Sequence, residues 1–165
     1  MVNLRNSVTA FLYNGENVLL IKRSASKLIA PNIWSGVGGH IEPHEINNPI
    51  QACYREIYEE TGIPQTAITS LELKYIILRR YKNEIRQNYI YFGHTSQVNL
   101  CQTCEGTLYW VPKNELTSKE YTQSFAAMLD HYVNTNKDDA VYVGVTQNNE
   151  GKLKMCWSRC EDFEH

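Results

Sequence analysis

A well-delimited helix behind a glycine-rich segment constrains this chain more than any other feature of its sequence. Asn48 is a favourable N-cap residue, and Pro49 suits the first position of a helix. Gly62 supplies a C-terminal stop, and Pro64 prevents the helix from continuing. These signals together predict a helix over residues 49–61.

Three glutamates share one face of this predicted helix. At about 100° per residue, Glu56, Glu59 and Glu60 fall within a sector of roughly 100°. Taken alone, the cluster is better interpreted as a solvated surface, because like charges four residues apart cost only a few tenths of a kcal/mol. A solvated acidic face usually carries interspersed lysines, however, and the only cation in this helix is Arg55.

The segment before the helix favours a metal site instead. Residues 34–41 contain three glycines and are predicted to form a short extended segment with tight backbone geometry. Because glycine has no Cβ, Gly38 and Gly39 allow a backbone carbonyl to approach a cation closely. Mg²⁺ prefers oxygen ligands such as carboxylates, carbonyls and water. The Gly38 carbonyl and the glutamates of the helix therefore form a candidate metal site.

Sequence periodicity indicates the remaining elements. Alternating and β-branched runs predict a set of strands: 7–13, 18–21, 71–80, 87–94, 108–111, 141–146 and 152–158. Apolar residues at helical spacing predict a second helix over residues 122–133. Turns are predicted at residues 14–15, 82–84 and 147–151. There is no internal repeat or linker, so one α+β domain over residues 1–165 is expected.

Composition and charge limit the class of partner. A chain of 165 residues with 42% hydrophobic and 21% charged residues is an ordinary globular domain. The net charge of −2 gives no basic footprint for a nucleic acid polymer, but it is compatible with a small anionic substrate. No signal peptide and no long apolar run are present, so a cytoplasmic protein without membrane contact is expected. A homodimer is compatible with the sequence.

The cysteines leave two interpretations open. Their odd number, five, fits a reducing compartment better than a disulfide framework. Two closely spaced pairs, Cys101/Cys104 and Cys156/Cys160, could supply four thiolates to zinc. Ordinary thiols are the simpler interpretation, because Cys156 precedes Trp157 in a predicted strand where neighbouring side chains point to opposite faces.

The residues around the first helix resemble the Nudix box. That box consists of Gly, five residues, Glu, seven residues, Arg-Glu-apolar, one residue, Glu-Glu, one residue and Gly-apolar. Here Gly39 is followed after five residues by Glu45, and after nine more by the run Arg55-Glu56-Ile57-Tyr58-Glu59-Glu60-Thr61-Gly62-Ile63. Segments 18–23, 34–43 and 110–112 also resemble the family. The chain is therefore similar to the MutT-like Nudix hydrolases over residues 8–116, with its box at 39–63.

Two positions depart from the family pattern. The segment between Glu45 and Arg55 is two residues longer than usual, and the capping signals assign this excess to the loop at residues 46–47. His44 replaces the glycine common before Glu45, and histidine is among the non-glycine residues that adopt positive φ. Neither departure removes a candidate ligand.

The resemblance implies a fold and a reaction. The fold would be an α/β/α sandwich around a mixed β-sheet. The reaction would be metal-dependent hydrolysis of a nucleoside diphosphate linked to a group X. The implied ligands of Mg²⁺ or Mn²⁺ are Gly38, Glu56, Glu59, Glu60 and Glu105, although Glu105 serves equally well as a solvated loop carboxylate. Either Glu56 or Glu59 would act as general base, and Arg55, with Glu45, would orient the carboxylates.

Residues for substrate binding are predicted less sharply. Arg23 and Arg79 are candidates for phosphate contacts, Trp34 for stacking on a base, and Ser35 for a hydrogen bond to it. Residues 32–39 resemble the branch of the family that hydrolyses oxidised nucleotides, which makes 8-oxo-dGTP a candidate substrate. That branch often has Asn where this chain has Ser35, and serine lacks the two-sided hydrogen-bonding pattern of an amide.

Two other functions fit the same fold. A nucleotide-binding sensor would keep the fold and lose turnover. An isomerase of the isopentenyl diphosphate type shares a Trp- and Glu-rich site. The complete hydrolytic box argues against both of these alternatives.

Overall fold

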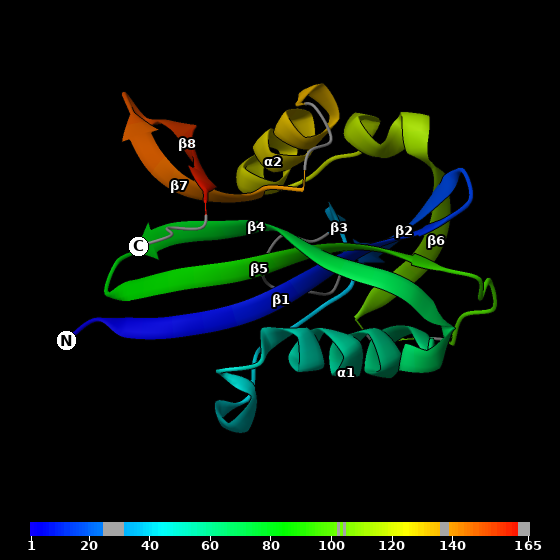
Figure 1. Ribbon diagram of the computed structural model, residues 1–165. Helices are drawn as coiled ribbons and strands as arrows, with labels where there is room; N and C mark the ends of the chain where they lie inside the picture. Colours follow the sequence, from blue (N-terminus) through cyan, green and yellow to red (C-terminus); the bar gives the residue numbers. More distant parts are fainter. Residues whose placement is uncertain (25–31, 102, 104, 136–138, 162–165) are drawn as a thin grey trace.

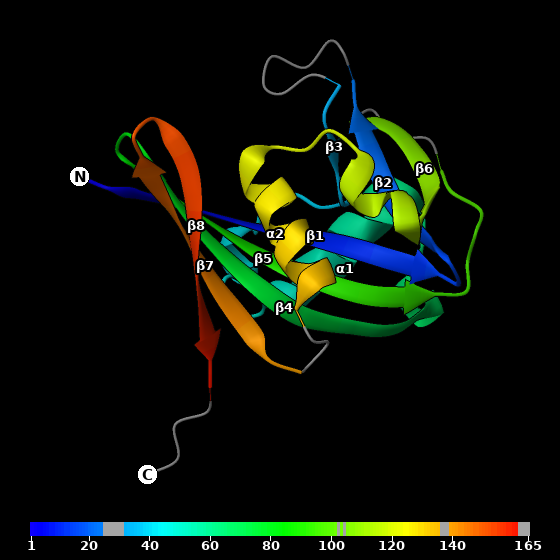
Figure 2. The ribbon, with the colours of Figure 1, turned by 90° about the horizontal axis from the view of Figure 1, so that it is seen from above.

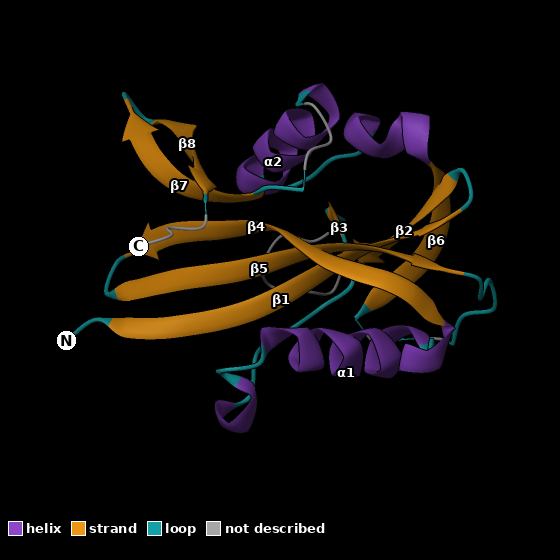
Figure 3. Ribbon diagram, in the orientation of Figure 1, coloured by secondary structure: helices purple, strands orange, loops and turns teal. Residues whose placement is uncertain are grey.

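A mixed β-sheet separates the two long helices of the fold (Figures 1 and 3). The computed structural model describes residues 1–24, 32–101, 103, 105–135 and 139–161. The helices are α1 (Pro49–Thr61) and α2 (Gln123–Asn134). The strands are β1 (Asn3–Asn14), β2 (Asn17–Arg23), β3 (Trp34–Ser35), β4 (Ile68–Tyr81), β5 (Glu84–Thr95), β6 (Gly106–Pro112), β7 (Val141–Asn149) and β8 (Lys152–Cys160). The predicted α/β/α sandwich is confirmed.

The sheet mixes parallel and antiparallel pairs. Its strand order is β3-β2-β1-β5-β4-β7-β8, and β6 also pairs with β2. β1 runs parallel to β5, and β4 runs parallel to β7, whereas the remaining pairs are antiparallel. Parallel neighbours need long connections, and here those connections contain α1 and α2. The helices therefore lie on opposite faces of the sheet, as Figure 2 shows from above.

β1 is buried on both faces over residues 8–12, which explains why its apolar residues do not simply alternate with polar ones. Val8, Ala10 and Leu12 belong to the core on the α1 side, together with Ile57 of the helix. Phe11 belongs to the core on the α2 side. Successive side chains of a strand point to opposite faces, so a strand in the middle of a three-layer fold must be apolar on both.

α1 begins and ends where its capping residues predict. Gly62 adopts the left-handed conformation, with φ of 73°, and its N–H donates to the Tyr58 carbonyl at 2.8 Å. Asn48 occupies the predicted N-cap position, although its side chain makes no capping hydrogen bond. Instead the Asn48 N–H donates to the Glu45 carbonyl at 2.7 Å, which links the helix to a 3₁₀ turn over Pro43–Glu45. The two extra residues of the box lie between this turn and α1.

Several strands are longer than their apolar residues predict. The terminal hairpin turns at residues 150–151 alone, both with positive φ, rather than over residues 147–151. The ladder continues through polar pairs such as Asn149 and Lys152. In contrast, the extended segment predicted over residues 34–41 contains only the short β3, followed by isolated bridges from Val37 and His40 to β1. Backbone hydrogen bonds determine where these strands begin and end, and hydropathy does not predict those bonds.

Within the described part of the chain, no helix is both long enough and apolar enough to cross a membrane.

Candidate active site

The glutamates of α1 line a cleft of about 580 Å³ at the edge of the sheet. One wall is α1, a second is the glycine-rich segment after β3, and the ends of β2 and β1 close the rest. The lining residues are Arg5, Ile21, Arg23, Ser35, Gly36, Gly38, Gly39, His40, Glu42, Arg55, Glu56, Glu59, Glu60, Thr103 and Glu105. The cleft therefore gathers most of the residues that the sequence nominated for chemistry.

Gly38 positions the floor of the cleft against β1. Val8 donates its N–H to the Gly39 carbonyl at 2.9 Å, which pulls this segment onto the strand. A Cβ at Gly38 would lie 2.1 Å from the Val8 carbonyl oxygen, and the φ of this residue is 151°. Only glycine fits such an approach. The Gly38 N–H in turn donates to Glu60 Oε2 at 2.9 Å, so the glycine segment holds one carboxylate of α1 directly.

Gly38→Ala is expected to lower the free energy of unfolding by roughly 1–3 kcal/mol or more, because the added methyl group overlaps rigid backbone. Urea unfolding monitored by circular dichroism measures this loss. Gly15→Ala is the matched control, since Gly15 also has positive φ but has nothing within 4 Å of a built Cβ. Equal stability of the two variants would contradict the close approach.

Arg55 uses all five of its N–H groups in the cleft, four for carboxylates and one for a backbone carbonyl. It donates to Glu45 through Nε at 2.9 Å and Nη2 at 2.8 Å, which is the contact the sequence suggested. Nη1 donates to Glu56 at 2.8 Å and to Glu59 at 3.1 Å, and Nη2 also donates to the His40 carbonyl at 3.0 Å. The bidentate pair with Arg55 lowers the pKa of the buried Glu45 to about 2.

Glu56 and Glu60 lie in surroundings that disfavour their charge. Burial raises the pKa of Glu56, although Arg55 opposes that shift. Burial also raises the pKa of Glu60, to about 7, with the carboxylates of Glu56 and Glu105 contributing and the Gly38 N–H opposing. Gly39 leaves room for this cluster, since a Cβ there would lie 2.4 Å from Glu56 Oε2. The cleft thus concentrates negative charge that a cation would stabilise.

The donor set fits a hard divalent cation by its chemistry. All the candidate ligand atoms are oxygens. The negative charges of Glu56 and Glu105 both help to raise the pKa of Glu60. As the side chains stand, no group of three His, Cys, Asp or Glu residues in the described ranges is arranged to hold a metal ion. Three of these carboxylates, Glu45, Glu56 and Glu59, instead form ion pairs with Arg55.

Two of the four predicted substrate contacts reach the cleft, and two do not. Arg23 and Ser35 line it, and the Nε atom of Arg23 is buried without a hydrogen-bond partner among the described residues. Trp34 does not line the cleft. Its ring centre lies 5.2 Å from that of Tyr109, and Lys22 Nζ lies 5.7 Å from the centre of the Trp34 ring. Arg79 lies on β4 outside the cleft.

Arg5 and His40 line the cleft without having been predicted from the sequence. Arg5 Nε donates to His40 Nε2 at 2.7 Å, which fixes the two side chains at one rim. Arg5 reaches this rim only because the glycine segment pairs with β1, through the bridge between Ser7 and His40. No local sequence signal reports that pairing.

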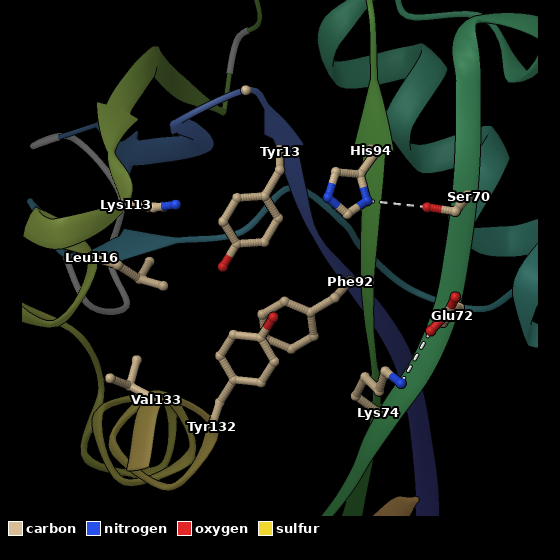
Figure 4. Close-up of a pocket in the computed structure, with 11 residues that line it drawn as sticks. Tyr13, Ser70, Glu72, Lys74, Phe92, His94, Lys113, Leu116, Tyr132 and Val133 are labelled. Carbon is tan, nitrogen blue, oxygen red and sulfur yellow. Dashed lines mark hydrogen bonds and ion pairs between the residues drawn. The ribbon is translucent and has the colours of Figure 1, made fainter. Parts of the chain in front are cut away.

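A second cavity, of about 460 Å³, lies between α2 and the sheet (Figure 4). Tyr13, Phe92 and Tyr132 give it an aromatic wall, and the Phe92 and Tyr132 rings stack with centroids 3.9 Å apart. Ser70 with His94, and Lys74 with Glu72, form bonded pairs on the β4–β5 side (Figure 4). None of the box residues lines this cavity. Its lining offers no carboxylate cluster for the predicted chemistry.

The described cysteines lie in different layers of the fold. Cys101 lies against Gly62 at the end of α1, and Cys53 is buried within that helix. Cys156 and Cys160 are carried by β8. Cys104, the remaining member of the proposed zinc set, lies outside the described residues.

Comparison with known proteins identifies the family. A NUDIX domain profile matches residues 3–132. Among solved structures, the chain is similar to the MutT protein of Bacillus halodurans, with a TM-score of 0.73, 19% identity, and coverage of 93% of this chain and 97% of that chain. It is also similar to the MutT protein of Methanosarcina mazei Go1, with a TM-score of 0.69, 19% identity, and coverage of 83% and 98%. At these identities, the structural likeness shows the fold.

A curated relative matches a shorter stretch. Over 48 residues the chain is 40% identical to the m7GpppN-mRNA hydrolase NUDT17 of Bos taurus. This match covers 29% of this chain and 15% of the bovine protein. The NUDIX profile, by contrast, covers more than half of the 165 residues. The chain therefore belongs to the Nudix family of hydrolases, which act on pyrophosphate bonds and generally use divalent metal ions.

Proposed function

We propose that this chain, as one domain over residues 1–165, hydrolyses a nucleoside diphosphate linked to a group X, with Mg²⁺ or Mn²⁺ bound in the cleft. A nucleoside triphosphate, including an oxidised one such as 8-oxo-dGTP, is the proposed substrate, cleaved to monophosphate and pyrophosphate. One observation carries the proposal. All five N–H groups of Arg55 hold Glu45, Glu56, Glu59 and the backbone at one wall of a cleft that also contains Glu60.

The candidate metal ligands are Glu56, Glu59, Glu60, Glu105 and the carbonyl of Gly38, and one of Glu56 and Glu59 serves as the general base instead. A bound divalent ion supplies charge neutralisation on the phosphate oxygens and lowers the pKa of bound water. Gly38 keeps Glu60 in place through its N–H, and Arg55 keeps Glu56 and Glu59 in place through Nη1. These fixed donors prevent the carboxylates from turning away from one another despite their repulsion.

Glu56 is the better placed of the two candidates for general base. Its side chain is only 13% exposed, whereas that of Glu59 is 55% exposed. Burial raises the pKa of Glu56 toward the range in which a carboxylate accepts a proton efficiently at neutral pH. We therefore assign Glu56 to take the proton from the attacking water, and Glu59 to the metal.

Arg23 is the proposed phosphate contact. Its buried Nε lacks a hydrogen-bond partner in the described part of the chain, which is costly for a charged donor unless a ligand supplies the acceptor. It lies at the end of β2. Its charge partly opposes the rise that burial causes in the pKa of Glu60. A phosphate oxygen would satisfy this donor. Ser35, on the neighbouring strand of the same cleft, is available to a base or sugar.

The wild-type protein is expected to release phosphate products from at least one compound of a diphosphate-linked panel. That panel contains the four common nucleoside triphosphates, 8-oxo-dGTP, ADP-ribose and the cap dinucleotide m7GpppG, each with Mg²⁺ or Mn²⁺. Ion-exchange chromatography identifies the bond that is cleaved, and EDTA is expected to abolish turnover. A folded protein that turns over none of these compounds would refute the proposal, and tight binding without turnover would assign a sensor instead.

A further inference from the structure

The strand register places three arginines side by side on the sheet. Arg5 of β1 is paired with Arg86 of β5, and Arg86 is paired with Arg79 of β4. Paired residues on neighbouring strands project from the same face. Arg5, Arg86 and Arg79 therefore form one row across three strands, here called the arginine row. These strand ends extend past both helices, toward the N label in Figure 1.

The arginine row begins at the candidate active site. Arg5 lines the cleft and is fixed there by its hydrogen bond to His40. Arg79 is two strands away, which corresponds to about 10 Å at the usual spacing of neighbouring strands. The row thus runs from the rim of the cleft across the α2-side face of the sheet, in phase with Phe11, Ile90 and Ile77 of the core on that side.

The arginine row is a charge arrangement that folding alone does not favour. Like charges directly opposite each other on neighbouring strands destabilise a sheet. Among the described residues, one carboxylate forms an ion pair with the row: Glu84 accepts a hydrogen bond from Arg86 Nε. Three arginine charges against one carboxylate leave a charge of +2. His40, the acceptor for Arg5, does not offset that charge, since its Nε2 accepts as a neutral ring nitrogen.

We propose that the arginine row binds a second anionic group of the substrate, a phosphate monoester separate from the diphosphate that is cleaved. This inference rests on the proposed hydrolysis of a nucleoside diphosphate linked to a group X, and within that class it favours compounds with an added phosphate monoester over plain nucleoside triphosphates. A phosphate monoester carries a charge of about −1.5 to −2 at neutral pH, which matches the charge of the row. Arginine forks also match the geometry of phosphate oxygens better than any other side chain does.

Pairs of dinucleotides that differ by one phosphate monoester test the inference. NADPH carries one ribose phosphate more than NADH, and coenzyme A carries one more than dephospho-coenzyme A. In each pair the wild type is expected to show a kcat/KM higher by about tenfold or more for the phosphorylated member, as a hydrogen bond to a charged group predicts. Arg79→Gln is expected to reduce this preference to less than about threefold, while activity on NADH changes by less than twofold.

Arg80→Gln is the matched control. It removes the same charge from the next residue of β4, but Arg80 pairs with Ile85 and lines a different, shallow pocket. This variant is expected to keep the wild-type preference. Arg79→Gln is also expected to melt at the wild-type temperature or slightly higher, because it relieves repulsion with Arg86. A lower melting temperature with unchanged preference would show that Arg79 is structural and would overturn the inference.

Failure of the inference and failure of the proposed function give different results. Turnover of both members of each pair at equal kcat/KM refutes phosphate binding by the arginine row and leaves the proposed function intact. If no member is turned over, calorimetry tests whether the arginine row binds a phosphate monoester, independently of catalysis. Adenosine 2′,5′-bisphosphate is then expected to bind at least about tenfold more tightly than AMP to the wild type, but not to Arg79→Gln. Equal affinities would refute the inference.

Discussion

Glu56→Gln is expected to lower kcat by roughly 10²–10⁴-fold on any compound that the wild type hydrolyses, the range typical of a lost general base. Glutamine keeps the shape of the side chain, but it neither accepts the proton of the attacking water nor offers a metal a charged ligand. Its amide oxygen still accepts the hydrogen bond from Arg55 Nη1. The folded structure should therefore survive, and KM is expected to change much less than kcat.

Steady-state kinetics with Mg²⁺, together with a melting curve for each variant, measure this effect. Glu72→Gln is the matched control, because Glu72 is a β4 carboxylate bonded to Lys74 beside the second cavity, away from the cleft. It is expected to retain wild-type kcat. A Glu56→Gln enzyme that keeps more than about a tenth of wild-type kcat would exclude Glu56 as the base and point to Glu59.

The local parts of the site were predictable because they rest on signals a few residues apart. The start and end of α1 follow from Pro49 and Gly62, and they fix the helical face that carries Glu56 and Glu60. Gly38 was nominated for close backbone approach, and its built Cβ would indeed overlap β1. Backbone geometry over a few residues can be predicted from the residue types at those positions.

Side-chain direction on long strands was not predictable. β4 has a register irregularity between Leu73 and Tyr75, which changes the residues that face each side of the sheet beyond it. The placement of Arg79 beside Arg86 depends on this bulge, and the placement of Arg5 depends on the parallel pairing of β1 with β5. Neither feature has a sequence signature in a single chain.

Trp34 shows the same limit on a shorter scale. The sequence offered Trp34 and Ser35 together as base-binding residues, but adjacent residues of a strand point to opposite faces. Ser35 consequently lines the cleft, while Trp34 packs against the core on the α2 side and carries Lys119 Nζ 5.7 Å from its ring centre. The pairing of β3 with β2 decides which of the two faces the site.

Arg55→Met is expected to lower the free energy of unfolding by roughly 3–5 kcal/mol at pH 7, the loss typical of removing one partner from a buried ion pair. Glu45 is only 7% exposed, and both of its carboxylate oxygens accept hydrogen bonds from Arg55. Methionine replaces the aliphatic part of the arginine side chain but leaves Glu45 charged and without these donors. Urea unfolding in EDTA, which excludes any metal contribution, measures the loss.

The pH dependence of this loss identifies Glu45 as its cause. In the wild type Arg55 lowers the pKa of Glu45 from 4.5 to about 2. The stability from the pair is therefore present above pH 4.5 and is lost as the pH falls toward 2. The difference between wild type and Arg55→Met should accordingly be largest near neutral pH and shrink below pH 4.5. A difference that stays constant across this range would assign the loss to packing rather than to charge.

The double variant separates the pair from the rest of the network. Glu45→Gln removes the charge that Arg55 neutralises, so Arg55→Met should cost much less stability in the Glu45→Gln background than in the wild type. Any loss that remains then belongs to the bonds from Arg55 to Glu56, Glu59 and the His40 carbonyl. Among these acceptors Glu59 is 55% exposed, so water replaces the donor there and little stability is lost. Strict additivity of the two substitutions would mean that Glu45 and Arg55 stabilise the fold independently, despite the 2.8 Å contact between them.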